Sequence, residues 1–292
     1  MSSAFLKRSA LALFLLLSAS SGLWATVDVR IGGGLFRASL PDLNSYLRDA
    51  TRYEFDGLRT VGYVLHSSFE EARGGRELTL SLSFPITNRL ALEAGAGYQK
   101  VSRRGNKMAL ESSFAFLDDT RDFSLASVPV FLGLDYGLPL GRAASVHVFA
   151  SGGLIFSNFK ESGEEVLTLK SGAEGYTHSW TAETSATGYG FQAGLGLEVK
   201  VAGPFGLFIR GGVRYAKVAG FTGQSTTRFN ASTDENDDLR LYYYEFTGNY
   251  PVKTYSAISL PNAAQGSRLE VIRDANLGIS GVFIGAGLRL GI

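Results

Sequence analysis

The segment YGFQAGLGLEVKV, residues 189–201, alternates between two kinds of side chain at every second position. One set is Phe191, Ala193, Leu195, Leu197 and Val199, and the other is Gln192, Gly194, Gly196, Glu198 and Lys200. A period of two is typical of a β-strand, because successive side chains point to opposite faces. The segment therefore predicts a strand with one apolar face and one small or polar face.

Seven further segments have the same rhythm, which gives about eight predicted strands. The eight are residues 27–35, 77–84, 90–101, 125–138, 146–159, 189–201, 205–218 and 277–292. The short connections, 85–89, 139–142 and 202–204, contain turn residues. The long ones are 36–76, 102–123, 160–188 and 219–276. This layout favours an all-β fold, a closed antiparallel up-and-down transmembrane β-barrel with short periplasmic turns and long extracellular loops.

Periodicity alone does not show which face contacts water. A soluble lipocalin-like barrel has the same alternation, with its apolar face inside and its polar face in solvent. The polar face is mostly Gly, Ser, Ala and Thr, which suits a narrow interior better than a solvated surface. Tyrosines stand near the ends of the apolar stripes, where interfacial aromatic residues belong. They are Tyr98, Tyr136, Tyr189 and Tyr215. We therefore expect the apolar face to meet lipid, and the soluble barrel remains the alternative.

Composition excludes several classes of protein. Lys and Arg number 28 and Asp and Glu 27, a net charge of +1 that argues against nucleic acid as the main partner. The chain has no cysteine, so it forms no disulfide and no thiolate metal site. No His, Asp and Glu cluster has convincing metal spacing. We therefore expect no cofactor and no metal.

The first 25 residues resemble a secretory signal peptide. Lys7 and Arg8 supply the positive start, and residues 10–17 are an apolar run shorter than the ~20 residues of a membrane-spanning helix. We expect cleavage after Ala25, with an N-terminal anchor as the alternative. Residues 26–292 are then expected to form one barrel domain.

The polar stripes carry charged residues that would face the barrel interior. They are Asp28, Arg30, Glu93, Asp135, His147, Glu198, Lys200, Arg210, Arg214 and Arg289. Most lie near a short turn or a chain end, so we expect them to cluster in the periplasmic half. Because unpaired buried charge is costly, they should pair across strands and block a continuous water channel. The alternative is a gated path for protons or solutes.

The last eight residues, Gly-Ala-Gly-Leu-Arg-Leu-Gly-Ile at 285–292, resemble the terminal assembly signal of outer-membrane barrels, with Gly287, Leu290 and Ile292 at its characteristic positions. The chain departs from that pattern in ending on Ile292 instead of an aromatic residue. With the strand pattern, this resembles the small barrels of the OmpA and OmpX type, within the outer membrane protein β-barrel domain family. The resemblance implies Sec-type export to the outer membrane of a Gram-negative-type bacterium, outer-membrane lipid and the assembly machinery as partners, and no cofactor.

The long connections hold the other candidates. Residues 41–51 could form a short helix, and residues 239–260 an extra hairpin. Residues 164–170 and 177–184 could extend the two strands that flank them, 146–159 and 189–201, beyond the membrane. The acidic run 234–238 is read as a solvated loop, with weak Ca²⁺ binding as the alternative. His66 and His178 are expected in loops. His178, Ser179 and a loop acid such as Glu174 could be assembled as a lipid-modifying site, and chance proximity of these common residue types is the favoured interpretation.

Function follows from these patterns as an expectation. The chain is predicted to be a surface or structural barrel, not an enzyme, whose long loops meet an extracellular partner. A narrow channel or transporter of small hydrophobic molecules is the first alternative. A lipid-modifying outer-membrane enzyme is the second.

Overall fold

The structure, a computed structural model, describes residues 27–173, 175–230, 232, 234–247, 254–259 and 269–292. The expected signal peptide, residues 1–25, and Glu174 lie outside these ranges. Eight antiparallel strands form a ring, each paired with two neighbours. They are β1 (Asp28–Ser39), β3 (Gly74–Pro85), β4 (Leu90–Glu111), β5 (Ala115–Leu140), β6 (Ala144–Leu169), β7 (Tyr176–Ala202), β8 (Phe205–Lys217) and β14 (Ser280–Gly291).

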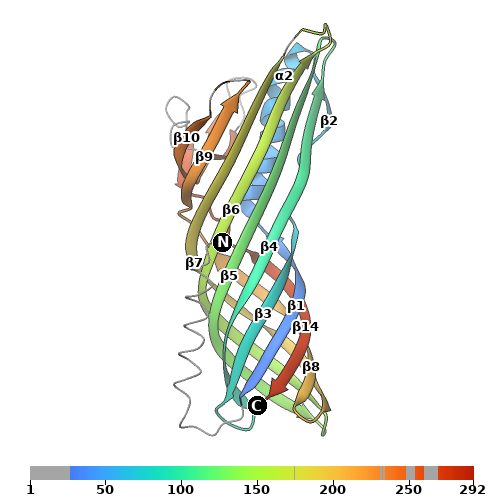
Figure 1. The fold of residues 1–292 in the computed structure, drawn as a ribbon, viewed down its shortest axis with the longest axis vertical. Helices are drawn as coiled ribbons and strands as arrows, with labels where there is room; N and C mark the ends of the chain where they lie inside the picture. Colours follow the sequence, from blue (N-terminus) through green and yellow to red (C-terminus); the bar gives the residue numbers. More distant parts are fainter. Residues whose placement is uncertain (1–26, 174, 231, 233, 248–253, 260–268) are drawn as a thin grey trace.

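The ring follows chain order, with β14 placed between β8 and β1. Three of its connections are tight turns at one end, as the sequence predicted. Gly141 (φ 76°) and Gly203 (φ 53°) take left-handed backbone conformations in two of these turns, which glycine adopts at no steric cost. The C-terminal end of β14 lies at this same end, beside the start of β1 (Figure 1).

The strands β4, β5, β6 and β7 are about twice as long as the other ring strands and build an extension above the ring (Figure 1). The predicted loop 102–123 was mostly wrong, because β4 and β5 continue through most of those residues. Within 160–188, the strand extensions expected at 164–170 and 177–184 are present as parts of β6 and β7. Between β5 and β6 the pairing runs without a register shift from Ala115 opposite Leu169 to Leu140 opposite Ala144. The extension is therefore continuous with the ring.

A helix lies against the extended strands and closes an apolar core (Figure 1). The helix α2 (Pro41–Leu58) begins with a proline in its first turn, which needs no amide hydrogen there, and continues into a 3₁₀ turn, η1 (Arg59–Val61). Leu43 and Leu47 from α2 are buried with Met108, Leu125 and Phe159 from the strands. No helix in the described part of the chain is long and apolar enough to cross a membrane.

Six short strands complete the extension. They are β2 (Val64–Ser67), β9 (Thr222–Phe229), β10 (Glu235–Arg240), β11 (Tyr242–Thr247), β12 (Thr254–Ser259) and β13 (Leu269–Asp274). β2 pairs with β4, β9 with β7, and β10 with β9. The hairpin expected at residues 239–260 is present as β11 and β12, and β13 joins it in a separate three-stranded sheet. The run 234–238 is mostly strand β10, so its interpretation as a loop was wrong.

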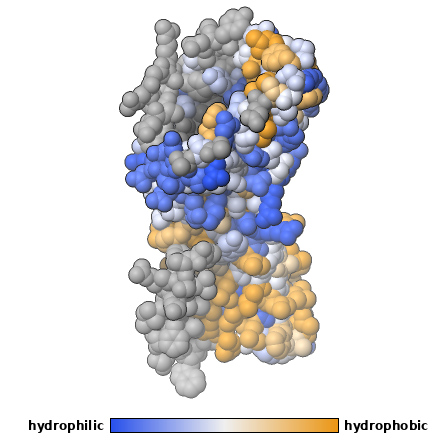
Figure 2. All heavy atoms as spheres, turned by 45° about the horizontal axis from the view of Figure 1, so that its top comes forward, coloured by the Kyte–Doolittle hydropathy of each residue, from blue (hydrophilic) through white to orange (hydrophobic). Residues whose placement is uncertain are grey.

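The outside of the ring carries a belt of exposed apolar side chains (Figure 2). On β5 alone, Val130, Leu132 and Leu134 are 46%, 56% and 49% exposed. Exposed members on the other strands include Ile31, Leu78, Leu154, Leu195, Ile209 and Leu288. We call this surface the apolar belt. Since monomeric soluble proteins rarely expose so continuous an apolar surface, the belt requires an apolar environment or partner.

Candidate functional site

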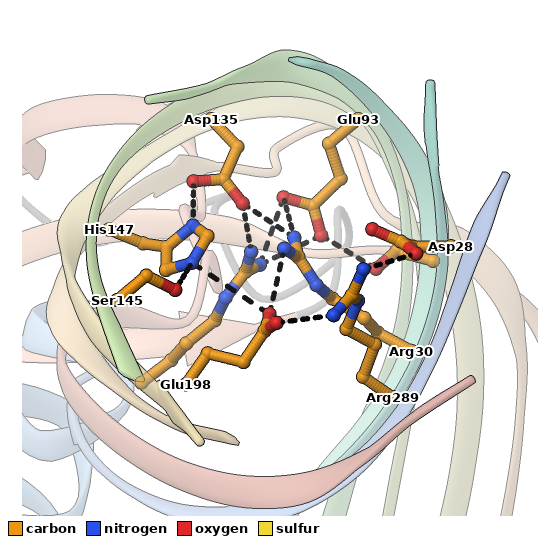
Figure 3. Close-up of polar contacts among 10 residues, drawn as sticks. Asp28, Arg30, Glu93, Asp135, Ser145, His147, Glu198 and Arg289 are labelled. Atoms are coloured by element: carbon orange, nitrogen blue, oxygen red, sulfur yellow. Dashed lines mark hydrogen bonds and ion pairs between the residues drawn. The ribbon is translucent and has the colours of Figure 1, made fainter. Parts of the chain in front are cut away.

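The inside of the ring holds a network of ion pairs (Figure 3). Its residues alternate with members of the apolar belt along the same strands, as Arg30 does with Ile31 and Asp135 with Leu134, so the network and the belt lie at the same height. Arg30 from β1 stands at the centre of the network and is 4% exposed. Its guanidinium donates to Asp135 at 2.5 Å and to Glu198 at 3.3 Å, and lies 3.8 Å from Glu93. Three carboxylates from three different strands therefore converge on one cation.

Arg210, from β8, shares two of these carboxylates. It donates two hydrogen bonds to Glu93, at 2.7 and 2.9 Å, and one to Asp135 at 2.7 Å. Ser81 donates to Glu93 at 2.6 Å. Such charge-assisted bonds are about twice as strong as neutral ones, and the forked Arg210 contact also fixes geometry.

His147 and Arg289 extend the network towards the tight-turn end. His147 lies 2.9 Å from Asp135 and 2.8 Å from the Ser145 hydroxyl. Arg289 donates to Glu198 at 2.8 Å and to Asp28 at 2.7 Å. Arg289 is directly cross-strand from Arg30. Two like charges in that position repel, so the carboxylate of Glu198, which both contact, is needed between them.

A second layer lies on the other side of a small cavity. Arg214 donates to Glu77 at 2.8 Å and to Gln192 at 3.1 Å. The cavity between the layers has a volume of about 50 Å³ and is lined by Glu77, Glu93, Arg210 and Arg214, among others. That is room for very few water molecules.

Phenylalanine rings fill the remaining interior. The Arg210 guanidinium lies 4.9 Å from the Phe149 ring centre and 5.7 Å from that of Phe208. The Arg214 guanidinium lies 4.7 Å from the Phe283 ring centre. These distances fit cation–π attraction, which gains strength where water is excluded. Within the described residues, the section of the ring lined by both layers is packed with side chains apart from the small cavity between them.

The structure brings together eight of the nine acidic, arginine and lysine residues predicted for the interior, as two adjoining layers. They are Asp28, Arg30, Glu93, Asp135, Glu198, Arg210, Arg214 and Arg289. The ninth, Lys200, is exposed and has no ion pair among the described residues, so its placement in the network was wrong. Lys200 lies two residues from the end of β7, at the open rim of the ring, where its side chain reaches solvent.

Sequence reasoning missed Glu77 and the three phenylalanines, and it placed Gln192 on the polar face without including it in the network. Glu77 was assigned to the very start of a strand, whereas β3 begins at Gly74 and places Glu77 inside. Phe149, Phe208 and Phe283 share the inward phase of their strands with the charged residues, and that phase is the signal that could have identified them.

The extension contains a second buried polar cluster, centred on Arg121 of β5. Arg121 donates to Asp119 at 2.6 Å and to the Tyr46 hydroxyl of α2, and its guanidinium lies 5.3 Å from the Trp180 ring centre. Burial raises the pKa of Tyr46, which Arg121 partly offsets. The arrangement fixes α2 to the sheet.

Glu54, on α2, has a carboxyl whose pKa is shifted towards neutral pH. Burial, and then the charge of Glu165, raise the pKa of its carboxyl to about 7. Burial also raises the pKa of Glu161, which receives the Tyr46 hydroxyl hydrogen. The helix-facing side of the extension therefore holds acids that favour the neutral form.

The histidines considered for catalysis lie apart. His178 and Ser179 are consecutive residues of β7 and so point to opposite faces of the strand. His178 lies against the rings of Trp180 and Phe229. His66 belongs to β2, not to a loop, and its ring nitrogen lies 3.0 Å from Glu111. No group of three or more potential metal ligands occurs among residues the structure describes.

The three residues of the expected assembly signal lie on or next to β14. Gly287 faces Gly32 of β1, and a Cβ there would collide with the Ile31 carbonyl oxygen. Leu290 is on the outside of the ring. Ile292 exchanges backbone hydrogen bonds with Val27 at 3.1 and 2.9 Å.

Comparison with known proteins gives distant structural similarity only. No protein-family model matches the chain, and no curated protein does. A major outer membrane protein from Thermus thermophilus aligns with a TM-score of 0.41 and 12% identity, covering 91% of this chain and 100% of its own. The outer membrane protease OmpT from Escherichia coli aligns with a TM-score of 0.29 and 9% identity, covering 94% and 100%. Both are outer-membrane proteins, and similarity this low carries no conclusion about activity.

Proposed function

We propose that the chain is an exported outer-membrane protein whose ring is a closed eight-stranded transmembrane barrel of one domain, non-enzymatic and non-conducting, which holds the extension outside the cell. The observation that carries this proposal is that the apolar belt and the ion-pair network lie at the same height. Apolar side chains face out at the level where charged ones face in, the reverse of a soluble barrel. Resemblance to the OmpA and OmpX type remains part of the proposal.

Bilayer physics explains why both features occur together. In hydrocarbon every backbone donor and acceptor needs an internal partner, and a ring of paired strands provides it. The enclosed interior is too narrow for bulk water, so its charges are balanced by one another. The interior thus acts as a plug that also fixes strand register.

The extension is then the part that meets an extracellular partner. Its far end exposes apolar side chains next to the helix, with Val61 57%, Val64 58% and Phe114 50% exposed. Exposed apolar clusters on a rigid, well-packed element are typical of interaction surfaces. The rigid core beneath them would present this end without a large ordering cost.

Fractionation combined with heat-modifiable gel migration tests the barrel and its location. We expect the mature protein in the outer-membrane fraction, released only by detergent, with unboiled and boiled samples migrating differently. Recovery of the protein in the periplasm as a detergent-free soluble species contradicts the proposal and supports the soluble barrel.

Planar-bilayer recording tests the plug. The wild-type protein should be silent, and the Arg30→Ala/Arg210→Ala variant, which lacks both central cations, should give small conductance steps. Lys200→Ala is the matched control and should stay silent, because Lys200 lies outside the network. Steady wild-type conductance would favour the channel alternative instead. Separately, the mass spectrum of lipid A should be the same with and without the protein, and a modified lipid would identify an enzyme.

A further inference from the structure

Three cations stand side by side on the outside of the ring, just above the apolar belt. Arg37, Arg76 and Lys100 belong to the neighbouring strands β1, β3 and β4, and all are exposed. Arg76 is directly cross-strand from Lys100 and, on its other side, from Leu35 of the belt. Arg37 is two residues beyond Leu35 and shares its face. Cross-strand neighbours have Cβ atoms about 4.5–5.5 Å apart, close enough for one ligand to touch two of them.

None of the three forms an ion pair with a described residue. Exposed lysines elsewhere in the extension do: Lys107 lies 3.0 Å from Asp118, Lys160 2.6 Å from Glu183 and Lys170 2.6 Å from Glu111. Like charges directly opposite on a sheet destabilise it. An anion held between Arg76 and Lys100 would remove that repulsion.

A surface groove connects two of these cations, Arg76 and Lys100, with the apolar belt. It has a volume of about 910 Å³ and is lined by Leu35, Leu78 and Tyr98 towards the belt, and by Arg76 and Lys100 above. Glycines, including Gly33 and Gly74, line it as well, and their lack of side chains leaves the groove open. The apolar wall suits an acyl chain and the basic end suits an anionic headgroup.

We propose that this groove binds a phosphorylated lipid of the surrounding outer leaflet, with an acyl chain along Leu35, Leu78 and Tyr98 and a phosphate between Arg76 and Lys100. The inference rests on the proposed membrane insertion. Arg76 and Lys100 line the groove, and Arg37 lies beside it, opposite Gly74. This positive charge matches a lipid with phosphate monoester groups better than a phosphodiester, which carries a single negative charge. Arginine contributes a forked donor pair that fits phosphate, and lysine a point charge.

Native mass spectrometry of the full mature chain, folded in a neutral detergent, tests the site with diphosphoryl lipid A as the probe. We expect the wild-type protein to retain lipid A and the Arg76→Ala/Lys100→Ala variant to bind it at least about tenfold more weakly, equivalent to about 1.4 kcal/mol. Arg76→Lys should restore much of the binding lost in Arg76→Ala. Arg89→Ala/Lys200→Ala is the matched control, since both cations are exposed at the opposite rim, and it should bind as the wild type does.

Competing probes identify the source of the phosphate. Phosphatidylglycerol should bind more weakly than lipid A, and inorganic phosphate should compete poorly because it gains nothing from the apolar wall. Equal binding by the double variant and the wild type would overturn the proposal, and so would inorganic phosphate competing as well as lipid A. Heat-modifiable migration, measured on the same samples, shows whether the barrel is intact. Absence of lipid binding by an intact wild-type barrel would therefore overturn this site alone.

Discussion

The ring and the extension are built from the same strands with opposite polarity. Along β5, odd-numbered residues face inward throughout. In the ring the apolar residues are even-numbered and exposed, such as Leu132 and Leu134, and the inward set includes Asp135. In the extension Leu117, Phe123 and Leu125 are inward and buried. The apolar set thus changes faces along one uninterrupted strand, which marks the level where the proposed lipid surroundings give way to water.

Strand phase determines which side chains share a face, whereas the surrounding medium determines which of the two faces is apolar. The phase is continuous because β5 and β6 pair without a register shift. With the ring embedded in lipid as proposed, the apolar set follows the side away from water, which is outside the ring and inside the extension. A substitution in the ring should therefore destabilise the ring alone, and a substitution in the core of the extension should destabilise the extension alone.

The largest effect is expected from the ring interior. Arg30→Met leaves three carboxylates without their shared cation, and breaking a buried ion pair costs about 3–5 kcal/mol. Heat-modifiable migration in urea, after refolding into vesicles, measures this loss. Arg142→Met, in an exposed turn, is the control and should change stability by no more than about 0.5 kcal/mol. An equally small loss in both variants would show that the network does not hold the ring together.

A matched pair of leucines on β5 compares the two regions directly. Leu125→Ala removes a fully buried side chain from the extension and should cost about 2–5 kcal/mol there, including the cavity left behind. Leu132→Ala, on the apolar belt, should lose only a transfer contribution of roughly 1–2 kcal/mol, because in the proposed bilayer lipid fills the space.

Trp180 gives a separate readout for the extension, since the only other tryptophan, Trp24, falls within the expected signal peptide. Thermal unfolding followed by Trp180 fluorescence should shift in Leu125→Ala, with little change in Leu132→Ala. Equal shifts would mean that ring and extension unfold as one unit.

The smallest effect is a pH dependence confined to the extension. The pKa of Glu54 is raised to about 7 in the folded chain, so the native state favours the protonated carboxyl. Its stabilising contribution is present below the ordinary glutamate pKa and is lost as pH rises through about 7. The thermal unfolding midpoint reported by Trp180 should therefore decrease as the pH is raised from 5 to 8. The decrease should be smaller in Glu54→Gln. An identical pH profile in both proteins would exclude Glu54 as the cause.

Much of the ring could be predicted from the sequence, because short-range alternation sets which residues share a face. The eight strands, the three tight turns and eight of the nine network charges follow from that rule. Lys200 was misplaced because alternation predicts which face a side chain is on, but not how far along the barrel axis it lies. At the rim of the ring, an inward-phase side chain reaches solvent. Glu77 was missed because the predicted strand began at residue 77, whereas β3 begins at Gly74.

The extension was predicted less well, for a physical reason. Its strands carry charged residues on the outer face and mixed apolar residues on the inner one, so segments such as 102–123 lack a clean lipid-facing stripe. Their pairing depends on α2, whose leucines supply the other half of the core. Nothing in the local pattern of β4 or β5 specifies that helix.

Local sequence was sufficient to set the strand period, the phase of each side chain and the identity of the charges that face inward, since these depend only on neighbouring residues along one strand. The assembled fold was needed to set how far the strands continue, which carboxylate each arginine contacts, and that Arg37, Arg76 and Lys100 become neighbours. Those outcomes depend on register between strands and on packing against a helix distant in sequence. Such long-range distances are fixed only when the ring and the extension come together.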